Sequence, residues 1–309
     1  MTRPIANISL DLDNLWSYLK THGDDAWASH PTYLDRVIDA ILPVLERVGV
    51  RITFFVVGRD AADPRNGEPL RRLVAAGHTI GNHSFEHEPW MQRWDADAVH
   101  AELAHAEEAL ASVFDHRPRV FRGPGYACSD TMLSVLAERG YAADCSRLPT
   151  WLGPVGRWYY FRTARLSAAQ RAERSELFGR WGDAARPLRP HNVETPAGSL
   201  LELPVTTTPL MRTPFHPSYI LYAAGYSGYL ADRYWDLALG LCRVRRVPPS
   251  ILLHPLDFVG GDEVPELGFF PAMRASGAEK RRRVERCLRR AAERFDCMPT
   301  TDFPEQLPA

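Results

Sequence analysis

Short apolar segments of strand character alternate along this chain with longer segments whose apolar residues recur at helical spacing. Residues 51–58 (RITFFVVG) are β-branched and aromatic, which is typical of a buried strand. Leu34–Val48 has helical spacing and stops at Gly49, a residue that often ends helices. Such an order requires parallel strands with helices on both faces. Because it recurs about seven or eight times, the sequence predicts an α/β barrel, in which active-site residues lie at the carboxyl ends of the strands.

The other predicted elements follow the same order. Further strands are predicted at Ala6–Asp11, His78–His83, Val120–Arg122, Tyr141–Cys145, Leu200–Thr206 and Ile251–His254. Further helices are predicted at Leu70–Ala76, Ala96–Phe114, Thr131–Arg139, Tyr219–Leu241 and Ala278–Phe295. The regular order fails over about residues 148–198, which we interpret as a long excursion over the strand ends within a single domain spanning residues 1–309. Because long loops there are often functional, we expect Trp151 in the excursion to contact the substrate.

Composition excludes several classes of protein. With 45% hydrophobic and 24% charged residues, the chain resembles an ordinary soluble globular protein. Its net charge of -1 argues against a nucleic-acid-binding protein. The five cysteines form no Cys-x-x-Cys pair, which favours buried free thiols over disulfides or a thiolate zinc site. We see neither a signal peptide nor a membrane-spanning stretch and therefore expect a cytosolic protein.

Three groups of chemically capable residues fall at the ends of predicted strands. Asp11 and Asp13 end the first strand, and strand alternation sends both side chains to one side. His83 and His87 follow the third strand at a spacing that puts both imidazoles on one face of a helical turn. His254 ends a late strand. All of them belong at one rim of a parallel sheet.

Two imidazoles and one carboxylate suit a divalent metal and leave open positions on it, as a catalytic site requires. We therefore assign Asp13, His83 and His87 to one metal ion, with zinc as the default and cobalt, nickel or manganese as substitutes. Asp11 is left to take a proton from the attacking water. Taken alone, such a His pair is often a surface coincidence and such an Asp a helix cap. Their joint occurrence at strand ends favours a metal site, and the other histidines, including His216, are predicted to be structural or exposed.

These motifs resemble the polysaccharide deacetylase family, also called the NodB-homology or carbohydrate esterase 4 family. RITFFVVG followed by GHTIGNHSFEHEPW is similar to the second strand and the His-Ser/Thr-x-x-His metal motif of that family. SLDLDN resembles its first motif, although with Asp-x-Asp in place of the commoner adjacent pair. FRGPGY resembles the third motif, YAADCS the segment before the fourth, and ILLHP the fifth.

The resemblance implies a deformed (β/α) barrel of seven or eight strands that hydrolyses an N-acyl group on an amino sugar. It implies that Asp11 is the base, that Arg122 orients Asp11 through an ion pair, and that His254 protonates the leaving amine. Gly125 stands where the family usually has an aromatic residue whose backbone N–H holds the oxyanion, and Tyr126 follows it. Asp144 is the predicted partner of His254.

The substrate is predicted from a Tyr-rich stretch, 214–231, that is free of acids and is followed by Arg233, Arg243, Arg245 and Arg246. Tyr and Arg side chains together favour a membrane interface. An aromatic core face of a barrel helix and a solvated basic face are the ordinary alternatives. A cytosolic deacetylase with such a surface resembles the family branch that acts on polyprenyl-phosphate-linked amino sugars, the precursors used to modify lipid A. We therefore expect peripheral contact with the anionic cytoplasmic leaflet.

Two other functions remain open. One is an amidase acting on a small soluble amide, a ureide or a cyclic imide. The other is a barrel that has lost catalysis and only binds sugar, against which the intact set of Asp11, Asp13, His83, His87 and His254 argues.

Overall fold

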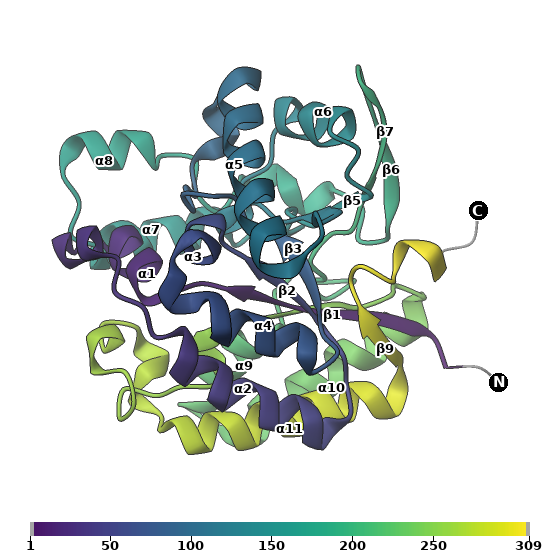
Figure 1. The fold of residues 1–309 in the computed structure, drawn as a ribbon. Helices are drawn as coiled ribbons and strands as arrows, with labels where there is room; N and C mark the ends of the chain where they lie inside the picture. Colours follow the sequence, from purple (N-terminus) through teal and green to yellow (C-terminus); the bar gives the residue numbers. More distant parts are fainter. Residues whose placement is uncertain (1–2, 307–309) are drawn as a thin grey trace.

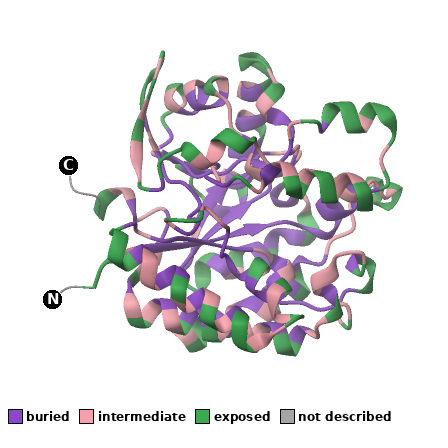
Figure 2. Ribbon diagram, turned by 180° about the vertical axis from the view of Figure 1, so that it is seen from behind, coloured by how far each residue is buried: buried purple, intermediate pink, exposed green. Residues whose placement is uncertain are grey.

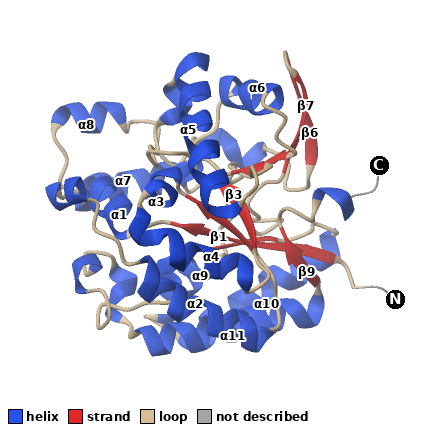
Figure 3. Ribbon diagram, in the orientation of Figure 1, coloured by secondary structure: helices blue, strands red, loops and turns tan. Residues whose placement is uncertain are grey.

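A curled sheet of nine strands runs through the computed structural model, which describes residues 3–306 (Figure 1). The strand order is β6-β7-β5-β4-β3-β2-β1-β8, and β9 pairs with β1. All the pairings are parallel except that of β6 with β7. Helices surround the inner strands of the sheet (Figure 3). These inner strands are buried, whereas the β6–β7 hairpin and the outward helix faces are largely exposed or half-buried (Figure 2).

The strands and helices have the following bounds. The strands are β1 Ile5–Leu12, β2 Thr53–Val56, β3 Thr79–Asn82, β4 Val120–Phe121, β5 Ala143–Asp144, β6 His191–Thr195, β7 Gly198–Glu202, β8 Ser250–Leu253 and β9 Asp296–Pro299. The helices are α1 Leu15–His22, α2 Leu34–Val48, α3 Gly58–Ala62, α4 Gly67–Ala75, α5 Ala96–Phe114, α6 Asp130–Glu138, α7 Gly153–Thr163, α8 Ala168–Glu173, α9 Pro217–Ala224, α10 Gly228–Arg245 and α11 Gly277–Arg294.

The deformed (β/α) barrel predicted from the sequence is confirmed, with two strands more than the sequence pattern contained. Neither β6 nor β9 was predicted, because β6 lies in the irregular excursion and β9 follows the last predicted helix. The segment after β7 forms hydrogen bonds with both β5 and β8. The Leu203 N–H donates to the Asp144 carbonyl at 2.8 Å, and the Thr206 N–H donates to the Ser250 carbonyl at 3.1 Å. The barrel is therefore deformed where an irregular segment replaces a regular ladder between β5 and β8.

One predicted helix is wrong in its extent. The structure divides the predicted helix Tyr219–Leu241 into α9 and α10. Helix α9 ends before Gly225, and the hydroxyl of Ser227 accepts the Leu230 N–H and so caps the start of α10. The apolar spacing continues across this break because both helices bury a face against the same core, and the sequence pattern therefore concealed it.

The excursion after β5 contains α7, α8 and β6. All five cysteines are free thiols, as the sequence predicted. Among the described residues, every helix is too short or too polar to cross a membrane.

Strand β1 has two faces of opposite character. Ala6, Ile8 and Leu10 are fully buried in the apolar core beneath the helices. The alternate residues, Asn7, Ser9 and Asp11, form a buried polar row on the other face. This alternation follows from the strand period of two residues, and it directs the row toward the end of β1, where Asp13 follows.

Candidate metal centre and active site

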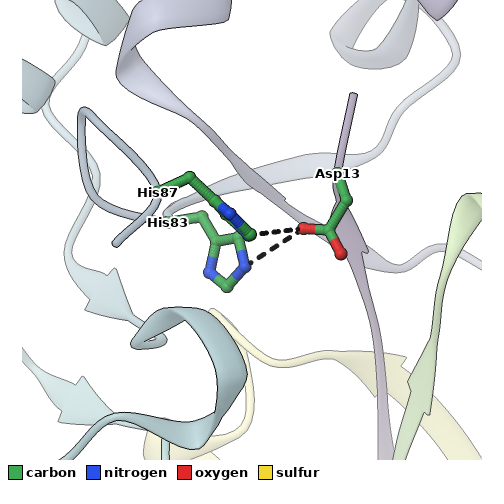
Figure 4. A group of neighbouring side chains, drawn as sticks. All are labelled: Asp13, His83 and His87. Carbon is green, nitrogen blue, oxygen red and sulfur yellow. Dashed lines mark hydrogen bonds and ion pairs between the residues drawn. The ribbon is translucent and has the colours of Figure 1, made fainter. Parts of the chain in front are cut away.

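Asp13, His83 and His87 converge at the carboxyl ends of β1 and β3 (Figure 4). The His87 Nε2 lies 3.0 Å from the Asp13 Oδ1, and the His83 Nε2 lies 3.4 Å from the same oxygen. One ligand atom of each side chain lies within 4.8 Å of the others, and all three residues are buried. The structure therefore brings together the three residues that the sequence assigns to a metal.

The two histidines meet through an irregular loop. Residues 83–87 are not helical, so the predicted helical turn is wrong. Ser84 and His87 have left-handed backbone conformations, with φ of 62° and 52°. The Glu102 carboxylate of α5 accepts the N–H groups of Phe85 and Glu86, at 2.8 and 2.7 Å. These hydrogen bonds fix a loop shape that sequence spacing alone does not specify.

Contacts from surrounding residues hold Asp13, His83 and His87 in place. The His83 Nδ1 lies 2.6 Å from the Arg122 carbonyl, so a proton on Nδ1 is donated to that carbonyl. The other ring nitrogen, Nε2, then keeps its lone pair and directs it at the site. The Tyr33 hydroxyl donates to the Asp13 carbonyl at 2.9 Å. The Trp16 ring meets the His87 ring edge to face at 6.4 Å, and the Trp16 Nε1–H is held by Asp60 at 2.8 Å.

The charges at this site fit a bound cation. Burial alone would raise the pKa of Asp13, but His87 and His83 outweigh it and hold that pKa well below its usual range. Burial would lower the pKa of His83, but Asp11 and Asp13 outweigh burial and raise that pKa above its usual value. The pKa of His87 is instead lowered, by burial and by the neighbouring His83. The site thus keeps one carboxylate ionised between two imidazoles. Such a donor set suits a divalent metal.

Asp11 lies beside this group and is held by a fully buried arginine. The Arg122 Nη1 donates to the Asp11 Oδ1 at 2.8 Å and to the Ser9 Oγ at the same distance. The Asp11 Oδ2 lies 4.0 Å from the His83 Nε2. The Arg122 guanidinium also stacks over Phe55, 4.3 Å from the ring centroid. The structure therefore contains the predicted ion pair between Arg122 and Asp11.

His254 follows β8, whose Leu253 pairs with Leu10 of β1, and this register brings His254 to the rim next to Asp11. The Ser218 hydroxyl donates to the Asp257 Oδ1 at 2.7 Å and lies 3.1 Å from the His254 Nδ1. The His254 N–H donates to the other Asp257 oxygen at 2.9 Å. Ser218 and Asp257 therefore hold His254, and sequence reasoning missed both of them.

The prediction that Asp144 partners His254 is wrong. Asp144 accepts hydrogen bonds from the hydroxyl and the N–H of Ser146, at 2.5 and 3.1 Å. It belongs to a second buried group with Cys128 and Glu202, beside Arg147, whose Nε lies 3.7 Å from the Glu202 Oε2. Burial and Asp144 raise the pKa of Glu202 well above its usual range. Arg147 supplies a positive charge beside these acidic side chains. We therefore interpret the group of Cys128, Asp144 and Glu202 as structural.

Gly125 and Tyr126 form a tight turn after β4. The Tyr126 N–H is engaged by the Gly123 carbonyl at 3.1 Å, which leaves the Gly125 N–H as the candidate oxyanion donor of this turn. Gly125 has a φ of 58°, and a Cβ there would lie 2.8 Å from the Pro89 Cβ. The structure therefore explains why glycine stands where the family usually has an aromatic residue. Burial, Tyr219 and Asp11 raise the pKa of Tyr126.

Trp151 lies at the start of the excursion and is 39% exposed. Its ring stacks on Trp181 at 6.4 Å, and its Nε1–H donates to the Met211 carbonyl at 2.8 Å. The structure thus places Trp151 on the outer surface and ties it to Trp181 and Met211, while its predicted contact with substrate stays a prediction.

His216 was predicted to be structural or exposed, and the structure instead buries it in the candidate active site. Its ring stacks on Tyr219 at 4.5 Å and meets the His254 ring edge to face at 5.8 Å. No signal in the sequence identified it, because it belongs to no motif and its contacts join segments far apart in the chain.

The structure is thus a curled α/β barrel with a buried carboxylate–imidazole group at the carboxyl ends of its strands. Residues 24–143 match the family model described as polysaccharide deacetylase. This segment therefore carries the sequence pattern of a polysaccharide deacetylase domain, and the resemblance drawn from the sequence motifs is confirmed. The matched segment contains His83, His87 and Arg122, whereas Asp11, Asp13 and His254 lie outside it.

Two curated relatives show the same likeness. A chitin deacetylase from Colletotrichum lindemuthianum is 31% identical over 113 residues, which cover 36% of this chain and 45% of that protein. A chitooligosaccharide deacetylase from Bradyrhizobium sp. (strain ANU 289) is 36% identical over 104 residues, which cover 33% of this chain and 46% of that protein. The matches thus span less than half of each relative.

A crystal structure of a candidate polysaccharide deacetylase from Mycobacterium smegmatis is similar over nearly its whole length. The TM-score is 0.59 at 19% sequence identity, with 99% of this chain and 94% of that chain covered. At this identity the likeness shows the fold, which extends beyond the matched family segment to both ends of the barrel.

Proposed function

We propose that this protein is a metal-dependent amidase that removes an N-acetyl or N-formyl group from an amino sugar. The observation that carries the proposal is the buried group of Asp13, His83 and His87, with the ion pair of Asp11 and Arg122 next to it. A divalent metal held by the three side chains would polarise the acyl carbonyl and acidify the attacking water. Zinc is the ion that this donor set favours.

In the proposed reaction, Asp11 removes the proton of the attacking water. Arg122 pairs with the Asp11 carboxylate and fixes one of its oxygens, so that the other is free to accept a proton. The Gly125 N–H would donate to the oxyanion that develops on the former carbonyl oxygen.

His254 supplies the proton that the departing amine needs. Because the Ser218 hydroxyl donates to Asp257, its oxygen accepts from the His254 Nδ1–H, which leaves the Nε2 to carry the transferred proton. Asp257 stabilises the imidazolium through this chain of hydrogen bonds, as a carboxylate does beside a catalytic histidine. The base and the acid of the reaction are thus separate residues on β1 and after β8.

Exposed aromatic side chains support a lipid-linked sugar as the substrate. They lie on the excursion after β5, on α9 and at the start of α10, and comprise Trp151, Trp158, Tyr159, Trp181, Tyr219, Tyr222, Tyr226 and Tyr229. We call them the aromatic rim. Tyr219 joins the rim to the candidate active site through His216, and the Tyr222 and Tyr226 hydroxyls lie 3.2 Å apart. Exposed apolar patches of this kind mark ligand-binding or membrane surfaces.

The predicted arginines do not all accompany this rim. Arg233 lies in the second turn of α10, but Arg243, Arg245 and Arg246 lie at its far end, about 27 Å along an 18-residue helix. That end of α10 leads into the amino end of β8, opposite the rim that carries the site. We therefore infer that aromatic contact, rather than the arginine cluster, holds a polyprenyl-phosphate-linked substrate at the cytoplasmic leaflet.

The proposal is tested by incubating the zinc-loaded protein with three substrates and following each by mass spectrometry. They are a polyprenyl-phosphate-linked N-acetyl or N-formyl amino sugar, a soluble N-acetylglucosamine oligomer, and a cyclic imide. Loss of the acyl group from the lipid-linked sugar supports the full proposal. Preference for the soluble oligomer would refute the lipid linkage alone, and turnover of the imide alone would refute the amino-sugar substrate.

Liposome flotation tests the role of the rim separately. Replacing Tyr226 and Tyr229 by Ser should weaken flotation with anionic liposomes by more than replacing Arg243 and Arg245 by Glu. The reverse order would show that charge attraction at the far end of α10 dominates.

A further inference from the structure

His216 is a buried histidine whose two ring nitrogens are free of protein partners. Its side chain is 4% exposed, and neither Nδ1 nor Nε2 has a hydrogen-bond partner among residues 3–306. Nearly all buried polar groups in proteins are hydrogen-bonded. Leaving one unsatisfied destabilises the folded state, and His216 carries two such atoms in one ring.

The position of this ring is fixed by the start of α9. The His216 carbonyl accepts the Tyr219 N–H at 3.0 Å, and Pro217 occupies the first position of the helix. The ring stacks on Tyr219 with only 17° between the two planes. The orientation is therefore set by packing and by the backbone, and no polar contact of the ring itself contributes to it.

The surroundings of the ring are those of the proposed reaction. The His254 ring, which would protonate the leaving amine, meets the His216 ring at a centroid distance of 5.8 Å and an interplanar angle of 81°. Tyr219 continues from His216 into the aromatic rim. Burial, His254 and Arg122 lower the pKa of His216 well below its usual value, which favours the neutral form of the ring. A neutral imidazole offers one N–H donor and one acceptor nitrogen.

We propose that His216 is a specificity-determining residue that hydrogen-bonds a hydroxyl group of the amino sugar beside the reacting amide, an inference that rests on the proposed function. A hydroxyl both donates and accepts, so it can satisfy either ring nitrogen of a neutral imidazole. A carboxylate or an ammonium group would satisfy only one kind of partner. The substrate amide is already engaged, since its nitrogen must face His254 and its carbonyl must face the metal group.

The test compares the zinc-loaded wild type with His216→Phe on a methyl glycoside of N-acetylglucosamine and its monodeoxy analogues. Phe keeps the ring shape and the stacking on Tyr219 and removes both nitrogens. In the wild type, loss of the recognised hydroxyl should lower kcat/KM by about 10- to 100-fold, the range expected for a buried hydrogen bond. In the variant, removal of that same hydroxyl should cost less than about threefold. His216→Gln, which keeps a donor and an acceptor, should restore part of the discrimination.

Two controls separate recognition from a structural role. His78 is another buried histidine, but its Nδ1 accepts the Ile52 N–H at 3.2 Å, so His78→Phe should lower stability and leave the discrimination between hydroxyls unchanged. His216→Phe should unfold at the same urea concentration as the wild type or a higher one, because it removes atoms without partners.

Equal losses across the analogues in the wild type and in His216→Phe would overturn the inference. Absence of wild-type turnover with every glycoside and also with the lipid-linked amino sugar would instead refute the proposed function. In that case His216 is tested by binding: ligand-observed NMR measures the affinity of the same analogues for the wild type and for His216→Phe.

Discussion

The ion pair between Arg122 and Asp11 should be among the most sensitive points of this fold. Arg122 is fully buried and donates to Asp11, Ser9 and the Cys145 carbonyl, all within 2.9 Å. Replacing Arg122 by Met keeps most of the aliphatic volume and removes the charge. The Asp11 carboxylate, 5% exposed, would then lose its cation.

Breaking a buried ion pair by removing one partner costs about 3–5 kcal/mol, because the remaining charge is left without compensation. Arg122→Met should therefore lower the free energy of unfolding by that amount, a large part of the about 5–15 kcal/mol that stabilises a typical domain. Adding Asp11→Asn removes the uncompensated charge. The double variant should regain at least about 1 kcal/mol relative to Arg122→Met.

Urea unfolding followed by tryptophan fluorescence measures these differences for the wild type, both single variants and the double variant. A matched control is Arg72→Met, since Arg72 pairs with Asp35 and Asp39 on the surface and should contribute less than about 1 kcal/mol. The reasoning is refuted if Arg122→Met costs no more than Arg72→Met, or if Asp11→Asn lowers the stability of Arg122→Met further.

Three further expectations follow from the same structure. His83→Ala should lose bound zinc by elemental analysis while the exposed-site control His100→Ala keeps it, and full zinc content in the first variant would contradict the ligand assignment. Asp11→Asn should retain zinc and lose turnover by on the order of a hundredfold or more, so a near-normal rate would identify another base. Burial and then Arg51 lower the pKa of His78 to about 4, below the value of about 6.5 in the unfolded chain. Protonation therefore favours the unfolded state, and stability should fall by about 2 kcal/mol as the pH drops from about 8 to about 5. His78→Gln should lose most of that pH dependence in urea unfolding, and an unchanged slope would assign it to other groups.

Local sequence patterns were sufficient for much of the fold. Helices α2 and α5 begin and end where helical spacing and the flanking residues predict. The division between α9 and α10 escaped prediction, because both helices bury apolar faces in one core and the spacing continues across the break. Strand β9 also escaped, since its pairing with β1 depends on a partner almost the whole chain away.

The sequence by itself determined which side chains could carry the chemistry. The alternation along β1 sends Asp11 and Asp13 to one side, and parallel strands bring His83, His87 and His254 to the same rim. Those relations depend only on the two-residue strand period and on the direction of the strands.

The tertiary structure alone decided what surrounds these residues. Ser218 and Asp257, rather than Asp144, hold His254, and His216 enters the site from the start of α9. Each of these contacts joins segments whose approach is set by how helices and loops pack on the curled sheet. A hydrogen bond between distant residues leaves no periodic trace in the sequence, and only the packed fold shows which partner each buried polar group has.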